Sequence, residues 1–202
     1  MHHTTRSFLC FAAIAAAISL NAPGARACPP TAKDAHFFGA FLGVPTVDLN
    51  LATGVQTVKF AGVGATNLMG DVLTRSEDEV YFPAPITDPV TGGVTQMDGT
   101  YKIIGDDGDS LVIWISSAPD QIQFDPTTGH MEFSGVFVVL RGTGHYRHAT
   151  GSGILTGSAD ASPAGAPFVG ADGMPHLTLK GEGRWAIWGT ISGVTGGPCL
   201  KH

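Results

Sequence analysis

The chain has 202 residues, 43% of them hydrophobic and 14% charged, and a formal net charge of −6 at pH 7. This length predicts one domain with a sizeable hydrophobic core. The acidic balance argues against nucleic acid and anionic lipid as partners, because both carry negative charge themselves.

Residues 1–27 have the pattern of a secretory signal peptide. Arg6 precedes an apolar segment, Phe8 to Leu20, and Ala25-Arg26-Ala27 forms a small-x-small cleavage site. Cleavage after Ala27 would remove two arginines and no acidic residue, so the formal charge would move from −6 to −8. The apolar segment is too short to span a bilayer, which takes about 20 helical residues. We therefore expect a secreted or periplasmic protein without a membrane span, with one domain over residues 28–202.

Two cysteines would remain after this cleavage, Cys28 and Cys199, and they stand near opposite ends of the chain. In an oxidising compartment they are expected to form a disulfide that ties the ends together. In the chain-entropy model such a long closed loop stabilises the fold by on the order of 4–5 kcal/mol. Lipidation of Cys28, which would be the first residue after cleavage, is the alternative.

Helical periodicity is almost absent, and short segments rich in Val, Ile, Thr, Phe and Trp alternate with turns that contain glycine and proline. This pattern predicts an all-β fold, a single antiparallel β-barrel of about eight main strands. The long connections 83–94 and 158–176 are expected to be loops. The predicted strands are Thr46–Leu51, Val55–Val63, Asn67–Thr74, Glu79–Phe82, Gln96–Ile104, Ser110–Ser116, Gln121–Phe124, Met131–Leu140, Gly153–Ala159 and Leu177–Ser192.

Two of these strands indicate which side chains face the core. In Leu177–Ser192 every odd position holds an apolar residue or glycine, and the charged residues stand at even positions, so Trp185 is expected inside the barrel. In Met131–Leu140 one face carries Phe133 and Phe137. The end of its other face is also apolar, with Val136, Val138 and Leu140. An apolar second face needs a cover, which predicts either a loop of the same chain or a homo-oligomer, a dimer or trimer.

Three stretches follow one another along the chain in an informative order: Gly105-Asp-Asp-Gly-Asp-Ser-Leu-Val-Ile-Trp-Ile115, then Met131–Leu140 with Arg141-Gly-Thr-Gly-His-Tyr-Arg-His-Ala-Thr-Gly-Ser-Gly153, then Gly181-Glu-Gly-Arg-Trp-Ala-Ile-Trp-Gly-Thr-Ile191. They resemble the Gly-Asp-x-Leu hairpin, the Gly-Thr-Gly signature and the last strand of the allene oxide cyclase/dirigent-type β-barrel superfamily, especially its secreted bacterial branch. The resemblance implies a barrel and relatives that are often trimers.

The same resemblance says little about a reaction. Arg141 and His145 stand where the signature usually has glycine and arginine, and the catalytic residues of the plant cyclases have no match in this chain. The resemblance therefore implies the barrel fold. It is compatible with a cyclase or isomerase activity but does not indicate which reaction.

Sites for metals or for hydrolysis are weakly indicated. His145 and His148 lie three residues apart in a glycine-rich bend, and three aspartates crowd the turn Gly105–Asp109, but no helix fixes their spacing and the turn lacks a calcium-loop pattern. Gly151-Ser-Gly153 precedes a strand and not a helix, so it does not form a nucleophile elbow. We expect solvated loop residues here, with no metal site and no cofactor; the catalytic residues of any reaction stay unknown.

Aromatic side chains are the remaining candidates for a site. Trp114, Phe133, Phe137 and Trp185 are expected to face the lumen of the barrel. A barrel of about eight strands is just wide enough to be filled by side chains or to hold one small ligand. Tyr101 or Glu132 would be available to orient a ligand.

Three functions therefore stay open from the sequence. The first is non-covalent binding of a small apolar molecule in the lumen without a cofactor. The second is a cofactor-free cyclase or isomerase that shapes a reactive guest, as the resemblance permits. The third is a structural or interaction protein whose barrel is filled. The contents of the barrel would separate the first two from the third.

Overall fold

The computed structural model describes residues 34–76, 80–82, 97–118, 121–125 and 128–195. These residues belong to one compact unit, Pro30–Gly196. The expected signal peptide, the two cysteines of the expected disulfide and the connection 83–94 lie outside the described residues.

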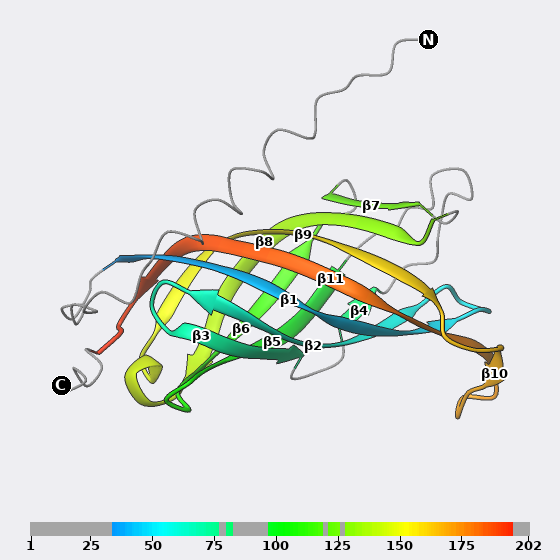
Figure 1. Cartoon of the computed structure of the whole chain (residues 1–202), viewed down its shortest axis with the longest axis horizontal. Helices are drawn as coiled ribbons and strands as arrows, with labels where there is room; N and C mark the ends of the chain where they lie inside the picture. The colour runs from blue at the N-terminus through cyan, green and yellow to red at the C-terminus, as the bar shows by residue number, and fades with distance from the viewer. Residues whose placement is uncertain (1–33, 77–79, 83–96, 119–120, 126–127, 196–202) are drawn as a thin grey trace, which may run out of the picture. The chain divides into compact units, whose positions relative to one another are not determined.

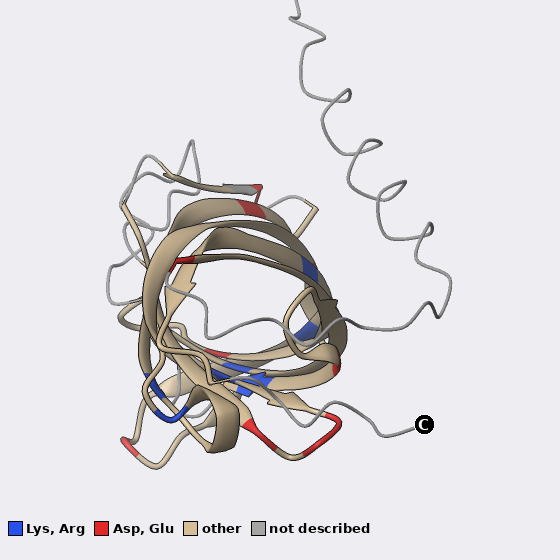
Figure 2. Cartoon of the chain, turned by 90° about the vertical axis from the view of Figure 1, so that its left-hand side faces the viewer, with Lys and Arg blue, Asp and Glu red and all other residues tan. Residues whose placement is uncertain are grey.

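Antiparallel strands close into a barrel, as the sequence predicts. The strands of the barrel wall are β1 (Ala35–Asn50), β2 (Gln56–Thr66), β3 (Gly70–Ser76), β5 (Met97–Gly105), β6 (Ser110–Ser117), β8 (His130–Gly142), β9 (Thr150–Pro163) and β11 (Pro175–Ser192). Their order around the wall is β1-β11-β9-β8-β6-β5-β3-β2, and the pairing of β2 with β1 closes the ring of eight strands (Figures 1 and 2).

Three short strands extend the wall at one end. β4 (Val80–Phe82) pairs with β2 and β5, β7 (Ile122–Asp125) with β8, and β10 (Phe168–Val169) with β11. All three lie at the end of the barrel where β1 finishes and β11 begins. We call this the pocket end, and the opposite end, where β1 begins and β11 finishes, the closed end.

Two expectations about strand limits are wrong. β1 begins at Ala35 and not at Thr46, because its first half pairs with β11 from Ala35 and with β2 from Gly39. The expected loop 158–176 is in part regular structure, because β9 continues to Pro163 opposite Leu179 and β10 follows it. Pairing with a neighbouring strand extends the strand in both cases beyond what local residue preference indicates.

The Gly-Thr-Gly bend has a specific steric cause. Gly144 adopts a φ of +51°, and a Cβ built there would stand 1.7 Å from a carboxylate oxygen of Asp109. That carboxylate accepts a hydrogen bond from the backbone N–H of His145 at 2.8 Å, at the start of the 3-10 turn Gly144–Tyr146. Only glycine leaves room for this close contact, so the glycine serves the fold.

The closed half of the barrel is filled by side chains. Phe37 and Phe137 are 1% and 0% exposed and their rings meet edge to face with centroids 6.2 Å apart. Tyr146 is buried with this core and its hydroxyl donates to the carbonyl of Leu68 at 2.9 Å. The other fully buried aliphatic side chains of the core are Ile103, Leu111, Ile113, Leu155, Ile187 and Ile191. Alternate residues of each strand supply this interior, as the two-residue period requires.

Candidate functional site

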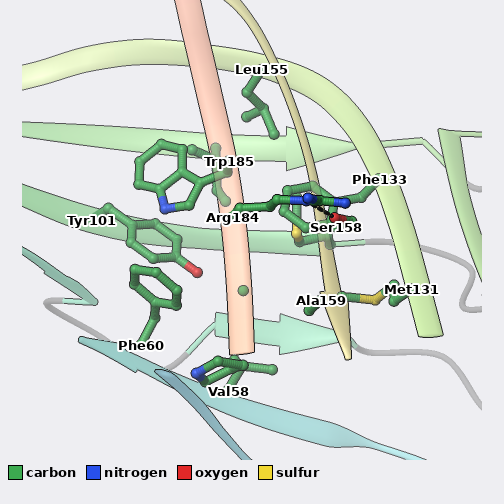
Figure 3. Close-up of a pocket in the computed structure, with 14 residues that line it drawn as sticks. Val58, Phe60, Tyr101, Met131, Phe133, Leu155, Ser158, Ala159, Arg184 and Trp185 are labelled. Carbon is green, nitrogen blue, oxygen red and sulfur yellow. Dashed lines mark hydrogen bonds between the residues drawn. The ribbon is translucent and has the colours of Figure 1, made fainter. Parts of the chain in front are cut away.

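A cavity of about 40 Å³ lies inside the barrel toward the pocket end (Figure 3). Its walls are mainly apolar and come from seven strands of the barrel wall. The described residues that line it are Pro45, Val58, Phe60, Met97, Tyr101, Ile115, Met131, Phe133, Leu155, Ser158, Ala159, Gly183, Arg184 and Trp185. Its lining, mostly apolar with few polar groups, has the composition of sites that bind apolar ligands.

Stacked aromatic rings form the floor of this pocket. The rings of Trp185 and Phe41 are stacked with centroids 4.1 Å apart and planes 21° apart. The ring centroid of Tyr101 lies 5.3 Å from that of Trp185. Phe60 contacts both rings: its ring centroid lies 6.0 Å from that of Tyr101 and 6.3 Å from that of Trp185. These contacts fix the ring positions, because aromatic pairs at such separations attract one another in defined orientations. These four rings therefore pack as one cluster at the pocket.

The hydroxyl of Tyr101 is the polar group best placed for a ligand. Figure 3 shows it pointing toward the middle of the pocket, away from the wall that carries its ring. No hydrogen bond joins this hydroxyl to another of the described residues. Burial raises the pKa of Tyr101, so the phenol stays protonated at neutral pH and can donate a hydrogen bond. A phenol O–H in an apolar pocket favours an acceptor such as a carbonyl oxygen.

A second donor lies in the same floor. Within the described part of the chain, the indole N–H of Trp185 is buried without a hydrogen-bond partner. Its ring packs against the Tyr101 ring, so this N–H is surrounded by aromatic surface and not by water. Leaving a buried donor unpaired costs free energy, which makes this floor a costly arrangement for a purely structural core.

Two of the four residues predicted to face the lumen line the pocket. Phe133 and Trp185 contribute to its walls. Phe137 also points inward but is packed in the filled half and does not reach the pocket. The placement of Trp114 in the lumen is wrong: it is half-buried, stands opposite the exposed Val138, and donates its indole N–H to the side chain of Asp98.

Sequence reasoning missed two members of the aromatic floor, Phe60 and Phe41. Phe60 lies in the predicted strand Val55–Val63, where it alternates with the exposed Lys59 and Ala61, so the two-residue period could have placed it inside. Phe41 belongs to the first half of β1, where Phe37, Gly39, Phe41 and Gly43 already alternate with exposed or half-buried residues. Of the polar candidates, Tyr101 lines the pocket and Glu132 is exposed.

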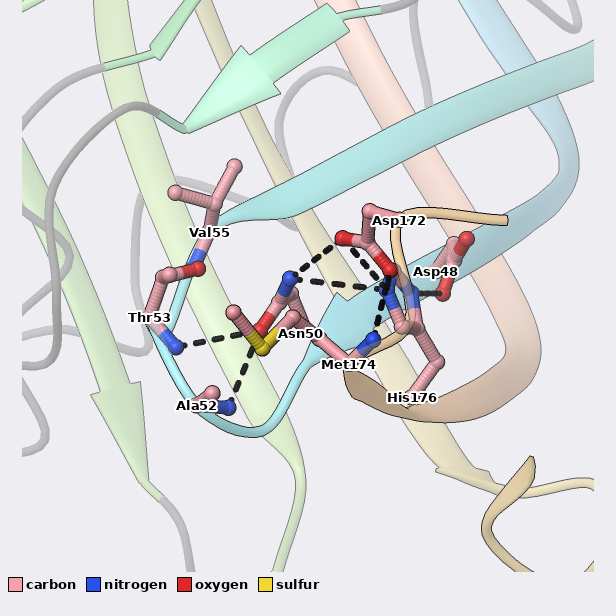
Figure 4. Close-up of polar contacts among 8 residues, drawn as sticks. All are labelled: Asp48, Asn50, Ala52, Thr53, Val55, Asp172, Met174 and His176. Carbon is pink, nitrogen blue, oxygen red and sulfur yellow. Dashed lines mark hydrogen bonds and ion pairs between the residues drawn. The ribbon is translucent and has the colours of Figure 1, made fainter. Parts of the chain in front are cut away.

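A histidine is held between two carboxylates at the pocket end (Figure 4). The Nδ1 atom of His176 lies 2.7 Å from Oδ1 of Asp48, and its Nε2 atom lies 3.0 and 3.1 Å from the two carboxylate oxygens of Asp172. Asn50 donates from Nδ2 to Asp172 at 3.0 Å. Hydrogen bonds to Asp48 first, and then to Asp172, raise the pKa of His176. Because both ring nitrogens face carboxylates, the imidazolium acts as a clamp and has no free nitrogen to serve as a base.

A second cluster joins two turns at the closed end. Ligand atoms of Asp107, Asp109 and His145 all lie within 4.8 Å of one another, whereas Asp106, His130 and His148 are not part of this group. Asp107 accepts the backbone N–H of Asp109, and Asp109 accepts that of His145. Burial, and then the charges of Asp107 and Asp109, raise the pKa of Tyr146 to about 12. These bonds explain the cluster as a link between the acidic turn and the glycine-rich bend.

No helix among the described residues is long and apolar enough to cross a membrane. Comparison of the chain with known protein families, curated proteins and solved structures finds no match in any of the three, so the barrel and its pocket stand as the basis for a functional assignment.

Proposed function

We propose that this protein binds a small apolar molecule non-covalently, in the pocket above the aromatic floor. One observation carries the proposal: one half of the lumen is filled by side chains, while the other holds a cavity of about 40 Å³. The Tyr101 hydroxyl points into this cavity and has no hydrogen-bond partner among the described residues. A core built only for stability gains from filling such a space and from pairing or removing such a hydroxyl.

The size of the pocket limits the guest. A cavity of roughly 150 Å³ accommodates a benzene ring, whereas 40 Å³ suits one end of a slender alkyl chain. Met97 and Met131 belong to the wall, and methionine side chains adapt to irregular guests because they are unbranched and flexible. The guest we propose is therefore a linear aliphatic molecule whose chain enters the pocket and whose other end extends toward the pocket end of the barrel.

The Tyr101 hydroxyl narrows the class of guest molecule further. A guest with a carbonyl oxygen near the inserted end would accept a hydrogen bond from Tyr101. The net value of such a bond is about 0.5–1.5 kcal/mol, equivalent to roughly a two- to tenfold gain in affinity. Hydrocarbons of the same length would bind through contact area alone. This preference distinguishes a built site from an accidental void.

The competing assignment is a structural or interaction protein with a filled barrel. The dense packing around Phe37 and Phe137 supports that assignment for the closed half. Titration of the protein with 2-hexanone and with n-hexane, followed by isothermal calorimetry and by tryptophan fluorescence, separates the two. Saturable binding of the ketone, weakened about two- to tenfold in Tyr101→Phe while hexane binding is unchanged, supports the proposal. Absence of saturable binding of either compound by the wild-type protein would leave the structural assignment.

A further inference from the structure

Two turns lie side by side at the outermost part of the pocket end. One joins β1 to β2 and begins with Leu51, and the other joins β10 to β11 over residues 170–174. The backbone N–H of Leu51 donates to the carbonyl of Pro175 at 2.8 Å, which fixes the first turn against the start of β11. β10 lies beside them, at the right-hand end of the barrel in Figure 1. We call the four large apolar residues of these segments the apolar tip: Leu51, Phe168, Val169 and Met174.

The side chains of the apolar tip are open to water. Val169 is 74% exposed, and the other three are exposed by 44% or 45%. Moving such groups from water into an apolar phase is favourable, in proportion to the apolar area removed from water. Four of them in adjoining segments therefore form a candidate interaction surface.

A polar network holds the two turns in place (Figure 4). Asp172, in the second turn, is bound by His176 and Asn50, and its Oδ1 atom also accepts the backbone N–H of Met174 at 3.0 Å. In the first turn, Oδ1 of Asn50 accepts the backbone N–H groups of residues 52 and 53, at 2.9 and 3.0 Å. The apolar tip is thus preformed, and binding does not have to order these turns.

The apolar tip is small for a stable protein partner. Even if each complete side chain offered about 250 Å², the upper value for an aromatic residue, the exposed fractions would amount to roughly 500 Å². A standard protein–protein interface takes about 800 Å² from each partner. A few apolar side chains in protruding turns instead suit the boundary between lipid headgroups and acyl chains, which takes up apolar groups of peripheral proteins.

The charges at this end of the barrel indicate the kind of bilayer. Residues 48–57 and 160–179, which include both turns and β10, contain no Lys or Arg, whereas Asp48, Asp160 and Asp172 lie among them. Anionic lipid surfaces attract proteins through clusters of Lys and Arg. The apolar tip therefore fits a zwitterionic lipid surface better than an anionic one.

We propose that the apolar tip docks the pocket end of the barrel onto a zwitterionic lipid bilayer. Elements that lie in the bilayer interface bury their apolar side chains about 5–10 Å deep, so docking would place the pocket end against the acyl chains. The inference rests on the proposed function for one point, the aliphatic nature of the guest. For such a guest the bilayer is the source, and docking lets it reach the pocket with little exposure to water.

The outside of the barrel wall supplies a matched control, because it also carries exposed apolar side chains. Ile154 on β9 is 44% exposed and stands opposite Val136 on β8, which is exposed to the same extent. The same substitution at Val169 and at Ile154 therefore compares the apolar tip with the wall. Aspartate is suitable for both positions, since a lysine side chain could keep its charge in water by snorkelling.

Flotation with phosphatidylcholine vesicles measures docking, calorimetry with 2-hexanone measures guest binding, and circular dichroism checks folding. We expect the wild-type protein and Ile154→Asp to float with the vesicles. Val169→Asp should bind them about tenfold more weakly or worse, because apolar contact is lost and a carboxylate would have to enter the interface. Leu51→Asp, in the other turn, should act in the same direction. Both tip variants should bind 2-hexanone like the wild-type protein.

The outcomes separate the docking from the proposed function. A wild-type protein that binds 2-hexanone but does not float would overturn the docking and leave the proposed function intact. Flotation that depends on Val169, in a protein that does not bind 2-hexanone, would support the docking and contradict the proposed function. Equal flotation of Val169→Asp and Ile154→Asp would overturn the docking through the apolar tip, as would stronger flotation with vesicles that contain anionic phosphatidylglycerol.

Discussion

The two halves of the barrel lumen are built from the same strands and yet differ in what they contain. In the closed half, Phe37 and Phe137 fill the interior and almost no surface of either is exposed. In the pocket half, the interior leaves about 40 Å³ between Phe60, Tyr101 and Phe133. The difference indicates that the barrel cross-section does not by itself decide between core and cavity: the volumes of the inward side chains decide it.

The filled half should respond most strongly to truncation. Phe137→Ala removes a fully buried ring and should lower the free energy of unfolding by about 3–5 kcal/mol, while ketone binding in the pocket changes little. Urea denaturation measures the stability. A loss of less than about 1 kcal/mol would show that the closed half is not the tightly packed core described above.

Two glycines that face the lumen on neighbouring strands allow the packing of the two halves to be compared directly. A Cβ on Gly39, in the filled half, would meet Cζ of Phe41 and Cγ2 of Thr66 at 2.9 Å each, so Gly39→Ala should cost about 1–3 kcal/mol through overpacking. A Cβ on Gly183, which lines the pocket, meets its nearest neighbour, Cε2 of Phe60, at 3.3 Å.

Gly183→Ala should therefore change stability by less than about 1 kcal/mol, while its methyl group takes up pocket space and weakens ketone binding. Thermal unfolding and calorimetric titration of both variants measure the two effects. Equal destabilisation by the two substitutions would mean that the halves do not differ in packing.

Truncation in the pocket wall should affect ligand binding more than stability. Phe133 is only half-buried, so Phe133→Ala should cost about 1–2 kcal/mol, less than Phe137→Ala on the same strand. Because its ring lines the pocket, the same change should lower ketone affinity by about tenfold through lost contact area. If Phe133→Ala and Phe137→Ala have the same effect on ligand affinity, the pocket is not the binding site.

The smallest effect concerns pH at the pocket end. The folded-state pKa of His176 is raised, so the clamp with Asp48 and Asp172 stabilises the fold fully below the unfolded value of 6.5 and is lost as pH rises through the folded value. The pKa of Asp172 is lowered, first by the backbone N–H of Met174 and then by His176, so its contribution is lost as pH falls below its ordinary value of 3.8.

His176→Gln should flatten the decline of stability above pH 6.5, measured by urea denaturation at several pH values. The wild-type decline persisting unchanged in His176→Gln would assign it to another group. His130, whose pKa is raised mainly by its hydrogen bond to Asp160, is the first alternative, and His130→Gln provides the matched control.

The sequence predicted the architecture and part of the site. The alternation in Leu177–Ser192 placed Trp185 inside correctly, because charged residues mark its other face. It failed for Trp114, because the strand Ser110–Ser117 is apolar on both faces and the period then identifies neither. The partner that keeps Trp114 outward, Asp98, comes from the neighbouring strand β5 and is not visible in local sequence.

Other features depend on pairing and on summed volumes. The first half of β1 becomes a strand through its pairing with β11, and the order of strands around the barrel follows from long-range contacts that periodicity does not encode. From the sequence, a filled lumen and a lumen with a ligand cavity remained open alternatives. Only the positions of Phe41, Phe60 and Tyr101 show that it is filled in one half and hollow in the other.

The methionines offer the most direct test of the central claim, that the pocket half takes an apolar guest and the closed half does not. Met97 and Met131 line the pocket, Met69 is buried outside it, and Met174 is exposed in a surface turn. Methyl NMR of protein labelled with [¹³C-methyl]methionine, titrated with 2-hexanone, reports on all four positions at once. We predict saturable shifts of the Met97 and Met131 signals, with those of Met69 and Met174 unchanged. No shift at Met97 and Met131, or equal shifts at all four, would contradict the account.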